Sequence, residues 1–298
     1  MRVSSRLLLL PLLLCTLPVL LLGACRRGGD SQPPVATPSI TLSRAKAALG
    51  SPMEITYKFA VARDAPKFAE DFTVMVHFVD SDEELMWTDD HRPPVPTTQW
   101  KPGETIEYTR TVFVPVYPYL GDAAIQVGLY SSKDSRRLPL AGEDSGQRAY
   151  KVGSLQLLAQ TENVFLIYKD GWHPPEVAAE NSVVEWQWTK GVAAILFRNP
   201  KRDCTFFLHA DNPGSAFNEP QNVEIVLNGQ QVDRFTLAPK QENIQRTAVK
   251  AAQLGSAEMA EVRIQVDKTY VPALIPAIHS RDPRELGIRV FHAFVEPR

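Results

Sequence analysis

Residues 223–237 read Val-Glu-Ile-Val-Leu-Asn-Gly-Gln-Gln-Val-Asp-Arg-Phe-Thr-Leu, and this stretch gives the most direct local indication of the fold. Asn228 and Gly229 separate two apolar runs, and an Asn-Gly pair in this setting is the strongest short signal of a β-hairpin. Both residues tolerate the positive φ angles that a tight turn between antiparallel strands requires. The stretch therefore predicts antiparallel sheet.

The rest of the chain repeats this pattern of short strands separated by turns. Apolar residues alternate with polar ones, so they would share one face of each strand. Turn signals such as Lys101-Pro102-Gly103 lie between the alternating runs, and a helix is expected only as a turn around residues 246–254. The alternating runs include residues 53–59, 72–78, 123–129, 183–189, 192–198, 205–210, 262–266 and 287–295.

The spacing of these strands predicts an all-β protein with two tandem antiparallel β-sandwich domains, Ig-like or jelly-roll-like. We expect a signal peptide over residues 1–24, a lipidated Cys25 with a Pro/Gly-rich spacer over 25–39, and sandwich domains over 40–160 and 161–298. No long Pro/Gly linker separates the two domains.

The amino-terminal residues have the features of a secretory leader. Arg2 and Arg6 precede an almost wholly apolar run over residues 7–22, which is the order of a charged region and an apolar region in a signal peptide. The run is shorter than the roughly 20 residues that span a bilayer, and Pro11 and Pro18 interrupt it. A cleaved leader is therefore favoured over a permanent transmembrane helix.

Leu22-Gly23-Ala24-Cys25 resembles the lipobox of bacterial lipoprotein precursors. The resemblance implies cleavage before Cys25, a diacylglyceryl group on its thiol and a fatty acid such as palmitate on the new amino terminus. The protein would then be anchored outside the cytoplasm in the cell envelope, and Arg26, in place of aspartate, favours the outer membrane over the inner one. An ordinary cleaved signal with a coincidental cysteine is the alternative.

Cysteine content and charge exclude several classes of protein. Of the three cysteines, Cys15 lies in the leader and Cys25 is the expected lipid site, so Cys204 alone would remain as a thiol, packed as a small buried residue. No disulfide, zinc or haem spacing is present, and no metal or cofactor is expected. Removing residues 1–24 removes two arginines and leaves 30 basic and 34 acidic residues, which predicts no nucleic-acid partner.

The acidic run from Asp80 to Asp90 lacks the ligand spacing of a calcium-binding loop. A hairpin loop that carries solvated charge is the favoured interpretation. His77 and His91 have no second histidine at metal-ligand spacing, so neither is expected to bind a metal.

Several motifs carry a resemblance to a known class of domains. The chain resembles the extracytoplasmic β-sandwich accessory modules of bacterial membrane glycosyltransferases of the protein-mannosyltransferase type. This resemblance implies an envelope or sugar-linked context without a reaction, because its motifs are structural. The motifs are residues 76–80, 89–94, 96–104, 128–130 and 137–140 in the first half, and 171–176, 186–189, 228–229, 267–273 and 284–288 in the second.

One group of residues in the second half could bind a ligand. Indole rings stack on the apolar faces of sugars while neighbouring polar groups hydrogen-bond to hydroxyls, which suits a glycan. The alternative is core packing, which is favoured for Trp186 and Trp188; for Trp172 the two interpretations are equally weighted. His292 is also expected in the core. The candidate ligand-binding residues are Trp172, His173, Glu176 and Trp188.

The sequence contains no G-x-S-x-G, H-E-x-x-H, P-loop or G-x-G-x-x-G motif, so we expect no enzyme and no catalytic residue. The favoured function is a lipid-anchored, non-catalytic envelope protein that binds glycan or assists envelope assembly. A scaffold subunit of a membrane protein complex is the alternative, and a glycoside-acting enzyme, which needs two converging carboxylates, is less favoured. The expected partners are the membrane, through the lipid anchor, an envelope polysaccharide and an envelope protein.

Overall fold

The computed structural model describes residues 32–160, 166–179 and 184–298. Strands dominate these ranges, and α1 (Ala251–Leu254) is their only α-helix. The leader and Cys25 lie outside the described residues. Within the described ranges, no helix is both long and apolar enough to cross a membrane.

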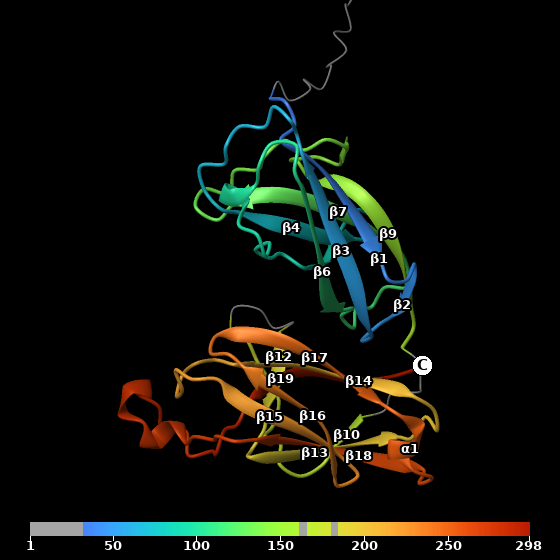
Figure 1. Ribbon diagram of the computed structural model, residues 1–298, viewed down its shortest axis with the longest axis vertical. Helices are drawn as coiled ribbons and strands as arrows, with labels where there is room; N and C mark the ends of the chain where they lie inside the picture. The colour runs from blue at the N-terminus through green and yellow to red at the C-terminus, as the bar shows by residue number, and fades with distance from the viewer. Residues whose placement is uncertain (1–31, 161–165, 180–183) are drawn as a thin grey trace, which may run out of the picture. The chain divides into compact units, whose positions relative to one another are not determined.

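The first sandwich consists of two sheets, one with the strand order β1-β3-β6 and one with the order β2-β9-β7-β4-β5, in which β8 also pairs with β9 (Figure 1). All strand pairs are antiparallel except β2 with β9, which is parallel and was not expected. The strands are β1 (Ala36–Leu42), β2 (Lys46–Ala48), β3 (Pro52–Val61), β4 (Phe72–Val79), β5 (Leu85–Thr88), β6 (Thr105–Phe113), β7 (Gly121–Ser131), β8 (Glu143–Asp144) and β9 (Tyr150–Leu158).

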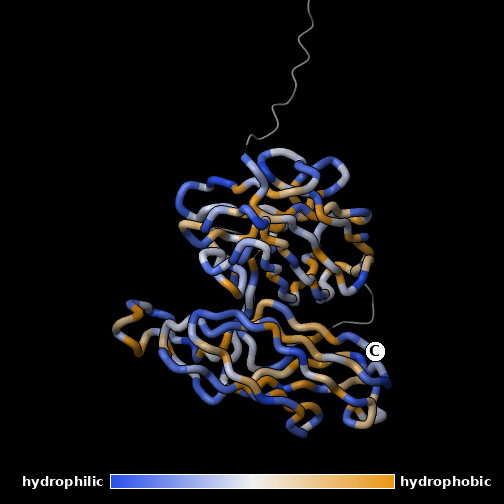
Figure 2. Tube along the Cα trace, turned by 45° about the horizontal axis from the view of Figure 1, so that its top comes forward, coloured by the Kyte–Doolittle hydropathy of each residue, from blue (hydrophilic) through white to orange (hydrophobic). Residues whose placement is uncertain are grey.

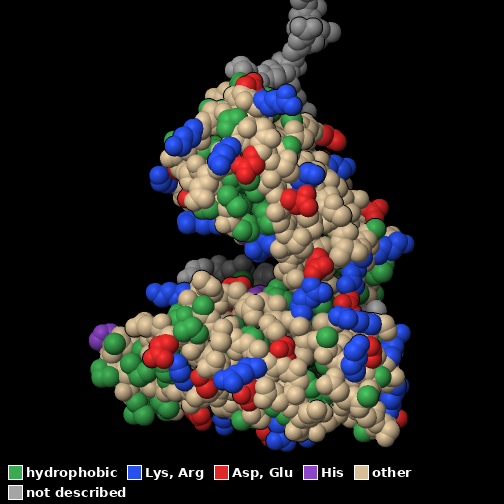
Figure 3. Space-filling model, viewed as in Figure 1, with side chains coloured by type: hydrophobic (Ala, Val, Ile, Leu, Met, Phe, Trp, Pro, Cys, Tyr) green, Lys and Arg blue, Asp and Glu red, His purple; other side chains and the backbone are tan. Residues whose placement is uncertain are grey.

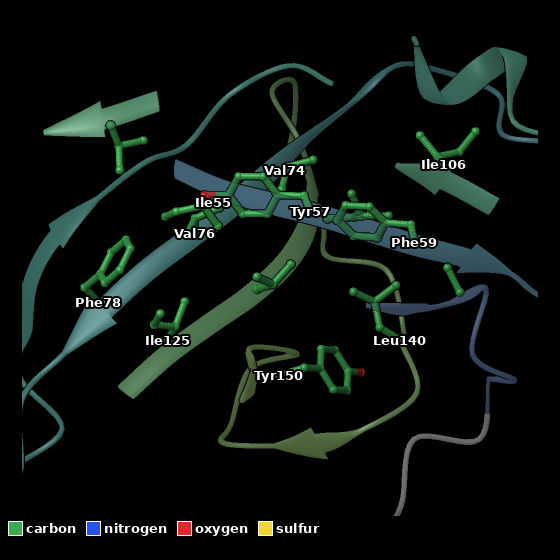
Figure 4. Close-up of a cluster of buried hydrophobic side chains, with 14 of the residues drawn as sticks. Ile55, Tyr57, Phe59, Val74, Val76, Phe78, Ile106, Ile125, Leu140 and Tyr150 are labelled. Atoms are coloured by element: carbon green, nitrogen blue, oxygen red, sulfur yellow. The ribbon is translucent and has the colours of Figure 1, made fainter. Parts of the chain in front are cut away.

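The alternation predicted for the first sandwich is confirmed. Met53, Ile55, Tyr57 and Phe59 of β3 are all buried, whereas the residues between them are not. Figure 4 shows the labelled side chains of β3 facing those of β4 and β7, which come from the opposite sheet. These residues belong to one hydrophobic cluster, so the sandwich is held together by apolar burial between its two sheets.

The first strand begins inside the stretch that was predicted to be a spacer. β1 starts at Ala36, which pairs with Val61 and is buried together with Val35. Pro38 does not prevent this pairing, because β1 is an edge strand and needs hydrogen bonds on one side only. Pro38 thus lies within an edge strand and not in a spacer, and the boundary at residue 39 is too late.

The second sandwich consists of two five-stranded sheets, with the orders β10-β13-β18-β15-β16 and β11-β12-β19-β14-β17. Two 3₁₀ turns, η3 (Pro272–Leu274) and η4 (Pro276–Ile278), lie between β18 and β19. The strands are β10 (Leu166–Tyr168), β11 (Glu176–Val177), β12 (Glu185–Trp188), β13 (Val192–Arg198), β14 (Cys204–Asn212), β15 (Gln221–Leu227), β16 (Gln230–Leu237), β17 (Gln241–Val249), β18 (Met259–Val266) and β19 (Arg289–Pro297).

The hairpin predicted at Asn228-Gly229 is present. Leu227 pairs with Gln230, and both turn residues have positive φ angles, 48° and 85°. Cys204 is buried, as expected, in the cluster between the two sheets. The helical turn expected over 246–254 is wrong over its first part, which belongs to β17, and correct for Ala251–Leu254.

Hydrophobic and hydrophilic residues alternate along the strands of both sandwiches (Figure 2). The described strands fall into two pairs of sheets at either side of residues 161–165, which the structure does not describe. The division at residues 160 and 161 stays a prediction. Residues 34–298 form one compact unit that contains every described strand.

The acidic stretch of the first sandwich separates into a turn and a partly buried ion pair. Asp80 Oδ1 accepts hydrogen bonds from the amides of Asp82 and Glu84, both at 2.9 Å, in the hairpin turn that was predicted. Asp89 instead accepts two hydrogen bonds from Arg110, at 2.8 and 3.1 Å, and one from the Tyr57 hydroxyl at 2.9 Å. No group of three potential metal ligands occurs among the described residues.

His91, which is itself buried, belongs to the same network. Its Nδ1 lies 2.6 Å from the Asp89 carbonyl oxygen and its Nε2 lies 2.8 Å from the Tyr108 hydroxyl. A carbonyl can only accept, so Nδ1 carries the proton, and Nε2 accepts the Tyr108 hydrogen. Burial, and secondarily the Arg110 charge, lowers the pKa of His91 below its ordinary value. The imidazole is therefore held neutral in the folded protein.

We predict that the free energy of unfolding decreases as the pH falls below about 6.5, where a histidine of the unfolded chain takes up its proton. The folded-state pKa of His91 is lowered, so its contribution to stability is complete above that pH and is lost as the pH falls toward the folded-state pKa. Urea unfolding at pH 8, 6 and 5 measures how steeply the free energy of unfolding changes with pH, and His91→Gln should reduce this slope.

His279→Gln is the matched control, because His279 is exposed. Desolvation also lowers the pKa of His77, and desolvation together with the neighbouring His209 lowers that of His292 to about 4, so a slope of the same sign should remain in the His91 variant. An unchanged slope in His91→Gln would contradict the neutral, buried state of this side chain.

Candidate functional site on the second sandwich

The structure brings the four candidate residues together along one pair of extended segments. Glu176 of β11 pairs with Trp186 of β12, and Trp172 forms a bridge with Thr189. The His173 amide donates to the Trp188 carbonyl oxygen at 2.9 Å. The segments 172–177 and 185–189 therefore lie side by side at the edge of the β11-β12-β19-β14-β17 sheet.

Gly171 makes this arrangement possible. Its φ angle is +86°, and a Cβ atom there would lie 1.9 Å from the Val192 carbonyl oxygen. Backbone of β13 thus passes directly against the residue, at a distance that only glycine allows. The chain passes from β10, in one sheet, to β11, in the other, at this close contact. The contact thereby sets the position of Trp172.

Trp172 is half-buried at the margin of the hydrophobic cluster. Its Nε1 donates to the Ala194 carbonyl oxygen at 2.8 Å, and its ring meets Tyr168 edge to face with centroids 4.7 Å apart. Tyr168 itself is 38% exposed. Trp172 therefore contributes to the core and supports an exposed tyrosine ring beside it.

Trp188 is 7% exposed and presents little surface to a ligand. The ring of Tyr270 packs edge to face against it, with centroids 6.1 Å apart, and Phe217 packs in the same manner on Tyr270. The segment between β18 and β19 thus covers Trp188 from outside the sheet. Trp188 is therefore a packing residue, which is the alternative that the sequence favoured for it.

His173 and Glu176 are fixed by the segment that leads into β19. His173 Nε2 lies 2.7 Å from the Glu285 carbonyl oxygen, and Arg284 Nη1 lies 2.6 Å from Glu176 Oε1. Arg284 also donates to both oxygens of Asp282, and these bonds, despite partial burial, raise its pKa. Glu176 is therefore neutralised by a guanidinium.

The face of this sheet that points away from the core carries an aromatic and ionic group. Arg289 donates to Asp211 through Nε at 2.9 Å and through Nη2 at 2.5 Å. Its guanidinium carbon lies 5.0 Å from the Trp186 ring centre and 5.5 Å from that of Phe291. Two aromatic rings thus pack on a planar cation that a buried carboxylate holds in place.

A β-bulge places His292 on this outer face. Simple alternation from Ile288 and Val290 would point His292 into the core, and the expectation of a core histidine is wrong for this reason. The register between β14 and β19 shifts at Phe291, so that His292 pairs with His209 and is exposed, while Ala293 and Val295 turn inward. The Nδ1 atoms of the two histidines are 3.3 Å apart.

Sequence reasoning missed Tyr168, Arg284, Arg289 and Phe291, because each acts through a partner that is distant in the chain. The bulge has no clear signature in the sequence, whereas the pairing of Asp211 with Arg289 could have been proposed from their strands. Trp186, for which the sequence favours core packing, is half-buried and belongs to this group.

Trp186 has an unusual feature. Its Nε1 atom is buried and has no hydrogen-bond acceptor among the described residues. Glu176 Oε1, on the strand opposite, is also buried and accepts no hydrogen bond of good geometry there, although it is ion-paired with Arg284. An unpaired buried donor is costly, so such a site is able to gain stability from a ligand oxygen.

Comparisons with known proteins give weak structural likenesses only. No family model matches the chain, and no curated protein matches it. A family GH115 4-O-methyl-alpha-glucuronidase with specificity for decorated arabinogalactans has a TM-score of 0.32 and 9% identity over 50% of this chain. The match spans 19% of the length of that enzyme.

Two carbohydrate-binding modules also match. The CBM22-1-CBM22-2 tandem domain of Paenibacillus barcinonensis Xyn10C has a TM-score of 0.28 and 10% identity, covering 84% of this chain and 79% of its own. CBM35 from Cellvibrio japonicus Abf62 has a TM-score of 0.26 and 13% identity, covering 44% and 91%. All these TM-scores lie below 0.5, so they carry no argument about function, and the resemblance to glycosyltransferase modules stays a prediction.

We predict that Gly171→Ala destabilises the protein by about 3 kcal/mol, because the added Cβ adds a backbone clash to an unfavourable φ angle. Gly229→Ala, at a φ of +85° with no atom within 4 Å of its added Cβ, should cost only about 1 kcal/mol. Equilibrium urea unfolding compares the two variants. Equal losses would mean that the close approach of Gly171 to β13 does not constrain the fold.

Proposed function

We propose that the protein is a non-catalytic glycan-binding protein whose site lies at the aromatic edge of the second sandwich. We define the aromatic edge as Tyr168, Trp172, Trp186 and Phe291, together with the carboxylate of Glu185. The observation that carries the proposal is Trp186, a partly exposed indole on the outer face of a sheet whose buried N–H has no acceptor among the described residues.

The chemistry of the aromatic edge suits a sugar ring. Trp186 and Phe291 lie at an interplanar angle of 65° with centroids 6.4 Å apart, and Tyr168 is exposed beside Trp172. Such rings offer apolar surface to the C–H faces of a pyranose. Glu185 is exposed next to Trp186 and would accept hydrogen bonds from hydroxyl groups. The indole N–H would donate to a ring or hydroxyl oxygen.

The acceptor oxygen does not reach Trp186 Nε1 in the present side-chain arrangement, because that atom is covered. Binding would therefore require a neighbouring side chain to turn aside. Arg284, whose side chain is 32% exposed and which is ion-paired with Glu176 opposite Trp186, is the side chain that we expect to move. A ligand would then satisfy the indole at the moment of binding.

The acidic groups near the aromatic edge support binding rather than catalysis. Glycoside hydrolysis uses two carboxyl groups on either side of the scissile bond. Here Arg289 holds Asp211 and Arg284 lies against Glu176, so each is already paired with a guanidinium. Glu185 alone of these three lacks a salt bridge among the described residues.

We predict that residues 32–298 bind one or more envelope or capsular polysaccharides and that Trp186→Ala weakens binding by about 1–3 kcal/mol, the scale of one lost aromatic contact. Trp172→Ala should also weaken binding, but indirectly, because Trp172 supports the exposed ring of Tyr168. Trp186→Phe keeps a ring and removes the N–H, so it should give an intermediate loss. Isothermal titration calorimetry against a panel of polymers measures the differences.

Tyr119→Ala, which removes a half-buried aromatic ring from the first sandwich, is the matched control and should bind normally. Unfolding curves confirm that each variant is folded. The proposal fails if no polymer in the panel binds, or if Tyr119→Ala and Trp186→Ala weaken binding equally.

We further propose that Cys25 carries the lipid anchor and that the protein is held on the extracytoplasmic side of the cell envelope, in the outer membrane. The support is the charged start of the leader, its apolar run and the Leu22-Gly23-Ala24-Cys25 motif. Several acyl chains on one residue give a durable attachment, because each buried CH₂ contributes about 0.8 kcal/mol.

The expected result for the full chain is incorporation of radiolabelled palmitate in a bacterial host, and its complete loss in Cys25→Ala. The wild-type protein should partition into the detergent phase of Triton X-114. Cys204→Ala is the control and should retain the label, because Cys204 is buried in the second sandwich. Label that persists in Cys25→Ala would contradict the assignment.

A further inference from the structure

An apolar segment projects from the second sandwich between β18 and β19. Residues 271–278 read Val-Pro-Ala-Leu-Ile-Pro-Ala-Ile and contain no polar side chain. They form the turns η3 and η4, which Figure 1 shows extending beyond the strands of their own sandwich. Hydrophobic side chains gather there in Figure 3, and Leu274 is 78% exposed. We refer to residues 271–278 as the apolar tip.

The backbone of the apolar tip is largely satisfied from within. The amides of Leu274, Ile275 and Ile278 donate to carbonyl oxygens three residues earlier, at 2.9–3.1 Å. The Ala273 amide donates to the Asp282 carbonyl oxygen at 2.9 Å. Pro272 and Pro276 have no amide hydrogen to satisfy. Four of the six N–H groups in the tip are thus bonded without water.

The internal hydrogen bonds of the apolar tip indicate which kind of partner it can contact. A protein partner or water can supply hydrogen bonds to open backbone groups, whereas the hydrocarbon of a bilayer supplies none. The tip has exposed apolar side chains and few backbone N–H groups without an acceptor, and its two prolines carry no N–H group at all. Such a segment is suited to a lipid environment. The tip is far too short to span a bilayer, so it would reach only the interfacial layer.

The residues that follow the tip fit the headgroup layer. His279 and Arg281 are both exposed and come directly after the apolar run. Arg281 has no ion pair among the described residues, and a free guanidinium at the base of an inserted segment can bind lipid phosphate. The sequence therefore changes from apolar to cationic over three residues, as at a membrane interface.

We propose that the apolar tip inserts into the interfacial region of a lipid bilayer, with Leu274 deepest and Arg281 at the phosphates. This second contact with the membrane rests on the tip alone and depends neither on the glycan site nor on acylation of Cys25. If Cys25 is acylated as well, the two contacts would restrict the orientation of the second sandwich on the membrane.

The test uses residues 32–298, which lack Cys15 and Cys25 and include the compact unit 34–298. Cys204 is buried, and burial raises the pKa of its thiol to about 11, so Leu274→Cys provides the single reactive site. The new cysteine is labelled with the environment-sensitive fluorophore NBD. The protein is mixed with vesicles of phosphatidylcholine containing phosphatidylglycerol, with and without doxyl-labelled lipid.

We expect NBD at position 274 to shift to the blue on adding vesicles and to be quenched by the doxyl lipid. Val192→Cys, at an exposed apolar position of β13 in the same sandwich, is the matched control and should show neither effect. In co-sedimentation, Leu274→Asp should lower the vesicle-bound fraction about tenfold, whereas Val192→Asp should not change it.

Two results would overturn the proposal. One is the same NBD response at positions 274 and 192, or vesicle binding that Leu274→Asp does not alter. The other is a concentration-dependent dimer in analytical ultracentrifugation without vesicles that Leu274→Asp abolishes, which would assign the tip to a second copy of the chain.

Discussion

A sheet in a sandwich buries one face against its partner sheet, and the other face is free to carry polar and aromatic groups. In the β11-β12-β19-β14-β17 sheet the inward residues include Leu208, Ala210 and Val290, which belong to the hydrophobic cluster. The alternation that buries them points Asp211 and Arg289 outward on the same strands. The composition of the candidate site is thus a consequence of how the core is built, since each outward residue is fixed by inward neighbours on both sides.

The Arg289–Asp211 ion pair organises that outer face. The Asp211 carboxylate is buried and accepts two hydrogen bonds from Arg289, which fix the orientation of the guanidinium plane. Trp186 and Phe291 pack on that guanidinium. The bulge at Phe291 adds the exposed His292 to the same face. Bulges often re-aim side chains near functional sites, and here the bulge changes the face on which His292 lies. The outer face therefore carries a partly exposed group of aromatic rings in which the N–H of Trp186 has no acceptor among the described residues.

Much of the fold could be predicted from the sequence, because period-two alternation and the Asn228-Gly229 turn are local signals. The buried residues of β3 and the burial of Cys204 follow from them. The candidate site was predicted only in part. Trp172 and Glu176 were chosen from one short motif, and the structure places them beside β12, but the cover that Tyr270 forms over Trp188 depends on a segment some 80 residues away. Likewise, nothing local distinguishes Asp89, which is paired with Arg110, from the solvated acids of the preceding turn.

The most direct measurement is the ¹H–¹⁵N NMR spectrum of the indole groups during titration with a polysaccharide fragment. The chain has five tryptophans, so each N–H gives one resonance that a Trp→Phe variant assigns. We predict a large shift for Trp186 Nε1, which gains an acceptor, and none for Trp100, whose Nε1 already donates to the Val95 carbonyl oxygen at 2.9 Å in the first sandwich. An unchanged Trp186 resonance at saturating ligand, or a shift confined to tryptophans of the first sandwich, would contradict a glycan site at the aromatic edge.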